Sequence, residues 1–202
     1  MAPARNLVTR FLDQAAARGD APFLWAKHAG TWRSTGWRAA AGAVAGLART
    51  LAAHGVAPGD RVVLVAENRP EWAIADLAVM AAGSITVPAY TTNTPDDHRH
   101  IVADSGAAAA IVSTPALAAR LAPAAAGLRC VVAIEPAAAA AFPAALPWAE
   151  AAAANADPGA LADAAARLDP AGTACLAPVV HGRPLFQSSA RFPLSFDTKD
   201  TG

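Results

Sequence analysis

Residues 61–66 form an apolar run that constrains the fold of this chain more than any other feature. The segment reads Arg-Val-Val-Leu-Val-Ala, with no polar residue after the arginine. A strand with one solvent face alternates polar and apolar residues, whereas a continuous run is typical of a strand buried on both faces. The pattern therefore predicts a sheet with helices on both sides.

Helical and strand patterns alternate along the rest of the chain. Helices are predicted around Phe11 and Ala15, from Trp37 to Leu51, from Pro70 to Ala82, from Thr94 to Ser105 and from Thr114 onwards, and further strands at 85–90, 108–113 and 129–134. This alternation favours right-handed βαβ units. We expect an α/β fold whose mostly parallel sheet has flanking helices.

Several local signals refine this picture. Apolar residues on either side of His28-Ala29-Gly30 predict a small β-hairpin that precedes the sheet. Ser34 or Thr35 is available as the N-cap of the helix that starts at Trp37. We expect Pro88 to lie at a strand end or at an edge of the sheet. We expect the next helix to start at Thr94, with a cap, a proline and two first-turn acids in order.

Composition changes twice towards the end of the chain. Residues 136–156 are of low complexity, mainly alanine and proline, and read as a surface connection or an alanine-rich helix of little specificity. Residues 161–168 are a candidate helix, and Thr173 to Leu176 a candidate strand. Residues 177–202 hold three of the six phenylalanines and show no regular period, so we expect a divergent, poorly ordered tail.

Overall composition limits the class of partner. Of 202 residues, 54% are hydrophobic, and 16 basic residues balance 16 acidic ones, which leaves no electrostatic footprint for nucleic acid or an anionic membrane surface. No segment predicts a transmembrane helix or a secretory signal. Cys130 and Cys175 are the only cysteines and are read as small hydrophobic side chains, which fits a reducing, cytoplasmic location.

Several motifs, taken in order, resemble a known family. They are Thr35-Gly36-Trp37, the stretch from Gly55 to Val62 with its Pro-Gly-Asp turn, Glu67-Asn68-Arg69-Pro70-Glu71-Trp72, the block from Ala81 to Tyr90, and Asp104-Ser105-Gly106. Their order and spacing over residues 6–176 resemble the start of AMP-forming acyl-CoA synthetases, the adenylate-forming ligases. The variant at 88–94, Pro-Ala-Tyr-Thr-Thr-Asn-Thr, is most similar to the long-chain fatty-acid type.

The resemblance implies an activity and its requirements. Such enzymes use ATP and magnesium to make an acyl-adenylate from a fatty acid and then transfer the acyl group to coenzyme A. The family holds the phosphates with a Ser/Thr/Gly-rich loop and a following lysine, placed after a strand like 173–176. Here that strand is followed by residues 177–184 without such a run, and Leu185 stands where the lysine belongs.

The chain therefore resembles only part of a ligase. We expect residues 1–176 to be a truncated N-terminal part of the AMP-binding domain, joined to a divergent tail that either a change of reading frame or a premature end of the gene would explain. The chain alone is expected to be inactive, and an active enzyme would need a complementing chain. Two alternatives stay open: a non-catalytic binding or interaction module on a ligase-like scaffold, and a non-functional truncated product.

Few residues qualify as site residues. Tyr90, Thr91 and Thr92 close a strand where α/β sheets bind ligands, so we expect them at the substrate cleft. No residue is assigned a catalytic, cofactor-binding or metal-binding role. The group with metal-ligand spacing, namely Asp96, Asp97, His98, His100 and Asp104, is read as a capped, solvated helix start. The tryptophans, among them Trp25, Trp32 and Trp148, are read as core or hairpin packing except Trp148, which has no assigned place.

Overall fold

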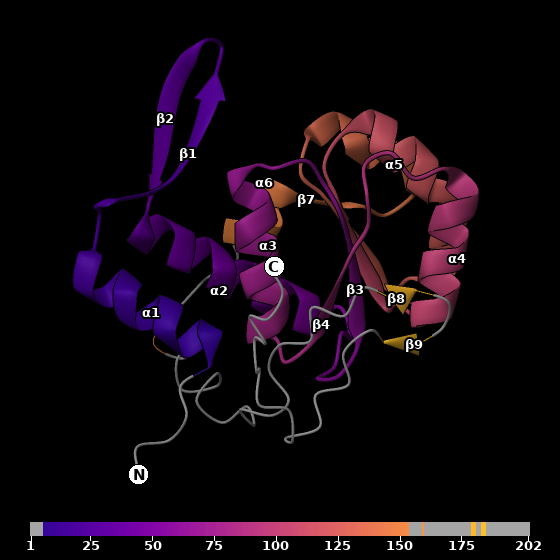
Figure 1. The fold of residues 1–202 in the computed structure, drawn as a ribbon, viewed down its shortest axis with the longest axis horizontal. Helices are drawn as coiled ribbons and strands as arrows, with labels where there is room; N and C mark the ends of the chain where they lie inside the picture. Colours follow the sequence, from indigo (N-terminus) through magenta and orange to yellow (C-terminus); the bar gives the residue numbers. More distant parts are fainter. Residues whose placement is uncertain (1–5, 154–158, 160–178, 181–182, 185–202) are drawn as a thin grey trace, which may run out of the picture.

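A five-stranded parallel sheet forms the centre of the molecule (Figure 1). The computed structural model describes residues 6–153, 159, 179–180 and 183–184. The strands are β3 (Arg61–Val65), β4 (Ile85–Pro88), β5 (Ala109–Val112), β6 (Cys130–Ala133) and β7 (Leu146–Pro147), in the spatial order β4-β3-β5-β6-β7. Every neighbouring pair is parallel. This confirms the α/β prediction, and Pro88 lies both at a strand end and on an edge strand.

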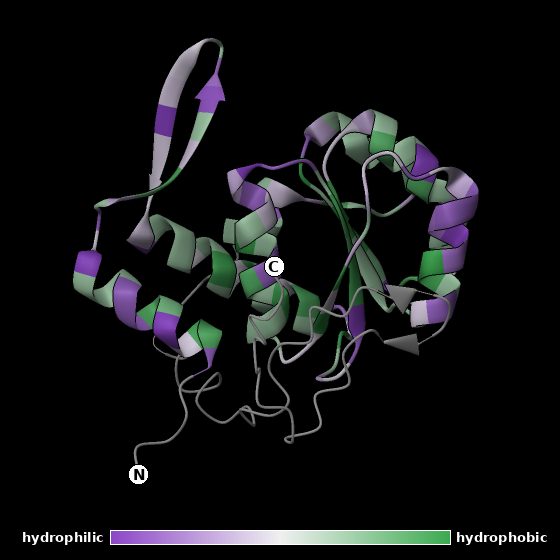
Figure 2. Cartoon of the chain, in the orientation of Figure 1, coloured by the Kyte–Doolittle hydropathy of each residue, from purple (hydrophilic) through white to green (hydrophobic). Residues whose placement is uncertain are grey.

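Helices cover both faces of this sheet. One layer contains α1 (Leu7–Arg18), α2 (Trp37–Ala53), α3 (Pro70–Ala81) and α6 (Trp148–Ala153); the other contains α4 (Pro95–Ser105), α5 (Pro115–Leu121) and the 3-10 segments η1 (Ala122–Gly127) and η2 (Pro136–Ala141). Side chains of β3 point alternately into the two layers, with Val62 and Leu64 in the first and Val63 and Val65 in the second. All four are fully buried, as the apolar run predicts. Figure 2 shows the strands as strongly hydrophobic and the exposed parts of α1 and α4 as hydrophilic.

Helix starts follow the predicted signals in two cases and depart from them in one. The Thr94 hydroxyl and the Asp97 side chain form a capping box at α4, and Thr114 caps α5. The N-cap of α2 is Gly36, whereas Ser34 and Thr35 are still paired with the neighbouring strand, so the predicted cap is wrong. A Cβ at Gly36 would lie 3.1 Å from the Asp20 carbonyl oxygen, which explains why glycine occupies this corner.

Residues 136–156 are more structured than their composition indicates. This segment contains η2, the edge strand β7 and α6, in which Ala138 and Ala151 are buried. Trp148 begins α6 and packs partly buried against the layer of α2. Of the two predicted alternatives, the surface connection is wrong for residues 136–153, and the alanine-rich helix is present in part, as η2 and α6 on either side of a short strand. Alanine allows the close helix packing that the composition alone does not reveal. Residues 154–156 lie outside the described part.

A two-stranded antiparallel hairpin stands apart from the sheet (Figure 1). It consists of β1 (Pro22–His28) and β2 (Thr31–Gly36), joined at Ala29-Gly30, as predicted. Trp25 and Trp32 are 56% and 62% exposed. The prediction of core packing is wrong for both, since no second layer covers that face of the hairpin, while both side chains do lie on one face of the hairpin.

The last part of the chain is described only at two short strands. These are β8 (Val179–Val180) and β9 (Arg183–Pro184), an antiparallel pair. The predicted helix at 161–168, the strand at 173–176 with Cys175 and the rest of the 177–202 tail lie outside the described residues. In the part that is described, no helix has the length and hydrophobicity needed to span a membrane.

Candidate functional site

The carboxyl edge of the sheet contains a topological switch point. The strand β3 comes first along the chain and lies between β4 and β5. The connection to β4 passes through α3 on one face, and the connection from β4 to β5 passes through α4 on the other. Ligands of open α/β sheets bind outside the carboxyl ends of the strands where the connections diverge. The region that follows β3, β4 and β5 is therefore the candidate site.

A carboxylate and a hydroxyl meet at this switch point. Ser113, which follows β5, is fully buried, and its hydroxyl donates a 2.5 Å hydrogen bond to Oε2 of Glu67, which follows β3. The Ser113 backbone N–H also donates to the Val65 carbonyl at 3.1 Å, so the parallel pairing continues past the strand ends. These bonds hold the Glu67 side chain at the mouth of the sheet.

A second charged network spans the same edge. Arg69 donates to Oε2 of Glu71 at 2.9 Å through Nε and to Oε1 of Glu135, after β6, at 3.0 Å through Nη1. Burial by itself would raise the pKa of Glu71, but the hydrogen bond and charge of Arg69, a backbone hydrogen bond and the charge of His28 together outweigh burial, and the net pKa lies below the usual value. The bond to Glu71 raises the pKa of Arg69. Arg69 and Glu71 are therefore both charged at neutral pH.

A cavity of about 600 Å³ opens between the ends of β3 and β4. Its lining comes from the two loops that follow these strands and from the first turn of α3, and consists of Ala66, Glu67, Asn68, Trp72, Pro88, Ala89, Tyr90 and Thr91. Tyr90 is 81% exposed. The Arg120 guanidinium of α5 donates a 2.8 Å hydrogen bond to the Thr91 carbonyl and fixes this loop. The cavity combines aromatic surface with a few polar groups, as small-molecule sites do.

The structure places two of the three predicted cleft residues in this lining. Tyr90 and Thr91 line the cavity, and Thr92 follows in the same loop without being part of the lining. Sequence reasoning missed Glu67, Asn68 and Trp72 as site residues. Their signal was their position directly after the predicted buried strand, which ends at the same edge as the strand before Tyr90.

The helix predicted at 94–105 is present with its capped first turn, and one of its residues is not solvated as expected. Asp96 pairs with Arg99, and Asp97 belongs to the capping box, in agreement with the non-metal interpretation. His98 differs because it is fully buried, and burial lowers its pKa. Among the described residues neither ring nitrogen of His98 has a hydrogen-bond partner.

The described residues give little support to a metal site or to a reactive cysteine. No group of three or more His, Cys, Asp or Glu side chains suitable for a metal ion occurs in the described part of the chain. The magnesium that the resemblance implies is therefore not assigned to these residues. Cys130 is buried and free, and burial raises the pKa of its thiol, as expected of a small buried hydrophobic residue.

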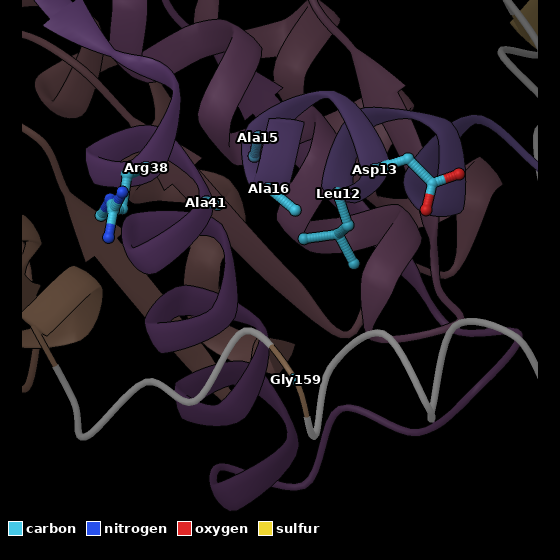
Figure 3. Close-up of a pocket in the computed structure, with 7 residues that line it drawn as sticks. All are labelled: Leu12, Asp13, Ala15, Ala16, Arg38, Ala41 and Gly159. Carbon is cyan, nitrogen blue, oxygen red and sulfur yellow. The ribbon is translucent and has the colours of Figure 1, made fainter. Parts of the chain in front are cut away.

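A second cavity of about 330 Å³ lies between α1 and α2 (Figure 3). It is lined by Leu12, Asp13, Ala15, Ala16, Arg38, Ala41 and Gly159. Most of this lining is aliphatic, and Arg38 is paired with Asp20 at 3.2 Å. No strand ends at this cavity, so it lacks the setting in which parallel sheets bind ligands.

Comparison with known proteins places the chain among ligases. The sequence profile of the family described as AMP-binding enzyme matches residues 11–177. A long-chain-fatty-acid–CoA ligase, FadD15 of Mycobacterium tuberculosis, is 38% identical over 85 residues, which cover 42% of this chain and 14% of that protein. A phenylacetyl-CoA ligase, epaB of Aspergillus niger, is 33% identical over 128 residues, 62% of this chain and 23% of that protein. The chain thus spans less than a quarter of either relative.

Solved structures have the same fold. An acetoacetyl-CoA synthetase from Streptomyces lividans superposes with a TM-score of 0.66 at 25% identity, over 76% of this chain and 26% of that one. A benzoate CoA ligase from Burkholderia xenovorans LB400 gives a TM-score of 0.63 at 24% identity over 76% of this chain and 29% of that one. The three-layer arrangement of sheet and helices is therefore that of the N-terminal region of these ligases.

Proposed function

The chain belongs to the AMP-binding enzyme family, and from this membership we propose that it forms one wall of the substrate cleft of a fatty-acid–CoA ligase. The cavity at the carboxyl ends of β3 and β4, beside the switch point and with Tyr90 and Thr91 in its lining, carries this proposal. Similarity to FadD15, a long-chain-fatty-acid–CoA ligase, supports a fatty acid as the substrate. ATP and coenzyme A are the co-substrates that the family uses.

The lining divides into two kinds of surface. Trp72 and Tyr90 offer aromatic faces against which a hydrocarbon chain loses contact with water. Asn68 and the Thr91 hydroxyl supply hydrogen-bonding groups for the polar end of a substrate. Glu67 and the Arg69 network keep the strand ends in register beside the cavity. We assign binding and orientation to these residues, and no step of bond making.

We further propose that the 202-residue chain does not turn over by itself. Residues 177–184 lack the Ser/Thr/Gly run that would hold the phosphates of ATP, and Leu185 replaces the lysine. Backbone N–H groups and hydroxyls of such a loop stabilise charge on the phosphates during attack, so its loss removes the step. A complementing chain that carries this loop would restore the reaction. The low cysteine content of this chain favours a cytoplasmic location for it.

Thermal melting with ligands tests the binding proposal. A non-hydrolysable palmitoyl-adenylate analogue raises the melting temperature of the wild-type chain, because a ligand that prefers the folded state stabilises it. The variant Tyr90→Ala/Thr91→Ala loses most of this shift. The control Thr31→Ala, an exposed threonine at the tip of the hairpin, keeps it. Equal shifts in both variants would show that the cleft lies elsewhere.

Pyrophosphate release with ATP, magnesium and palmitate tests the second proposal. We expect none from the purified chain. If pyrophosphate release stays with the chain through a second purification step, the proposal that the phosphate loop is required is wrong. Saturable binding without turnover, even beside a chain that carries the loop, would favour a binding module. Aggregation with no ligand effect would favour a non-functional product.

A further inference from the structure

The β1–β2 hairpin presents one uncovered face, which we call the outer hairpin face. It consists of Trp25, Lys27, Trp32 and Ser34. The register pairs Trp25 with Ser34 and Lys27 with Trp32, so all four side chains point to the same side. Each of them is exposed. On the opposite side Leu24 is half-buried and packs against the main core, which orients the hairpin with its outer face towards solvent.

Aromatic side chains on this face are closely spaced. Trp25 and Trp32 are diagonal neighbours across the two strands, a placement that lets large side chains interact. Two largely exposed indoles on one face of a hairpin form an apolar patch, and such patches mark binding surfaces. Each indole also keeps an N–H that needs a polar partner. An apolar body with a polar edge suits the boundary between hydrocarbon and headgroups.

All the ionisable side chains of the hairpin are basic. Residues 22–36 contain Lys27, His28 and Arg33 and no acidic residue, although the whole chain is neutral. Lys27 lies on the outer hairpin face itself. Arg33 lies on the other side near the tip and is exposed, and its long stem allows the guanidinium to reach past the edge of the strand. Positive charge beside indoles complements a surface of phosphate headgroups.

We propose that the outer hairpin face binds an anionic lipid surface and docks the chain on it reversibly. The two permanent cations and the two indoles act together, since basic residues attract anionic lipids and the aromatic rings enter the interface. A nucleic acid fits less well, because binding to it draws mainly on many phosphate contacts. The hairpin extends beyond the helical layers in Figure 1.

Cosedimentation of the full chain with sucrose-loaded vesicles tests this inference. We expect binding to vesicles of phosphatidylcholine and phosphatidylglycerol, weaker binding to phosphatidylcholine alone, and loss of binding at high salt. Lys27→Gln/Arg33→Gln lowers partitioning by about fivefold for each cation. Trp25→Ala/Trp32→Ala lowers it about tenfold or more. Arg10→Gln, which removes one positive charge from the exposed side of α1, leaves partitioning within about twofold instead of the roughly fivefold expected per hairpin cation.

Two further readouts keep the result unambiguous. The melting temperatures of the hairpin variants equal that of the wild type, since the changed side chains are exposed, and this excludes unfolding as the cause. Brominated lipid quenches tryptophan fluorescence in the wild type and not in Trp25→Ala/Trp32→Ala. Absence of vesicle binding at low salt, equal losses in the Arg10→Gln control, or tighter binding of a single-stranded oligonucleotide than of vesicles would each overturn the proposal.

Discussion

Gly46 sets the distance between α2 and α6. A Cβ at this position would lie 2.2 Å from the Ala152 carbonyl oxygen, so the two helices pack with backbone against backbone. The same contact brings the Thr50 hydroxyl within 2.9 Å of the Ala151 carbonyl, to which it donates a buried hydrogen bond. A glycine in the middle of a helix costs stability by itself, and here close packing compensates for that cost.

Gly46→Ala should therefore lower the free energy of unfolding. We expect a loss of about 1–3 kcal/mol, because the added methyl group forces the helices apart. Gly42→Ala is the matched control on the same helix: a Cβ there meets nothing within 4 Å, and we expect a gain of about 0.5–1 kcal/mol. Urea unfolding monitored by circular dichroism measures both. A gain at both positions would mean that α6 does not pack as described.

Asp76 on α3 gives a pH-dependent prediction. Burial raises the pKa of its carboxyl, and among the described residues Oδ1 has no hydrogen-bond partner. When the pKa of an acid is higher in the folded protein than in the unfolded chain, the folded state prefers the protonated acid. The free energy of unfolding therefore falls as the pH rises above the unfolded pKa of about 4. Asp76→Asn should raise the melting temperature at pH 7 and have little effect near pH 3.5.

At the level of single residues the sequence predicts local interactions better than tertiary ones. Thr94 and Asp97 were predictable as a cap because a capping box is formed within four residues. The burial of His98, one residue further on, was not, since it depends on how α4 packs against the opposite elements. The exposure of Trp25 and Trp32 was missed for the same reason: a hairpin predicts pairing, while only the tertiary structure decides which face is covered.

The stability of α4 depends on the capping of its first turn more than that of α2 or α3 does. Its hydrophobic side is small, and His98 is its one buried residue, so packing contributes less here than in α2 or α3. The hydrogen bonds of the capping box compensate at the N-terminus. The left-handed Gly106, at φ 58°, ends the helix as the sequence predicts.

Thr94→Ala should destabilise the fold through this helix. We expect a loss of about 1 kcal/mol, the usual cost of removing a side-chain cap. Asp104→Ala, at the other end of α4, should be neutral or slightly stabilising, because an anion is unfavourable near a helix C-terminus. Guanidinium unfolding of the two variants compares them directly. Equal losses would show that helix propensity, and not capping, controls α4.

Elements with large apolar side chains were predictable, and alanine-rich ones were not. The runs that became β3 and β6 contain consecutive valines, whose pattern indicates burial on both faces. In 136–153 small side chains carry no such signal, and β7 has only two residues. Its place in the sheet comes from pairing with β6 and from the contact of α6 with α2. These are long-range interactions that a local pattern does not contain.

Across the whole molecule, Arg69 joins parts of the chain that are far apart in sequence. It links the start of α3 to the loop after β6, with β5 between them in the sheet. At the carboxyl edge only the strand ends were predictable. They led to Tyr90 and Thr91, whose place in a substrate cleft stays a prediction, whereas the network of Arg69, Glu71 and Glu135 requires the strand order. That order follows from crossover connections, which the sequence leaves open.

Arg69→Met should change both the stability and its pH dependence. In the wild type the lowered pKa of Glu71 contributes stability above the unfolded pKa of about 4.3, and this contribution is lost as the pH falls through the folded value. Without the cation, burial of Glu71 disfavours its charged form. We expect a loss of about 1–3 kcal/mol at pH 7 that shrinks on acidification, measured by urea unfolding at several pH values.

Arg38→Met is the matched control for this change. Its ion pair with Asp20 is largely exposed, and exposed pairs contribute little. We expect a change of less than about 0.5 kcal/mol with no shift in pH dependence. A similar effect of both variants would show that the Arg69 network does not hold the sheet edge together.

The position of β3 also determines the order in which the molecule can assemble during synthesis. This strand leaves the ribosome first among those of the sheet, yet it lies between two partners that are translated later. When α3 and β4 have emerged, Val62 and Leu64 already have helices to pack against, whereas Val63 and Val65 still await α5. A nascent chain of this length carries one bare valine face, the kind of surface that chaperones recognise.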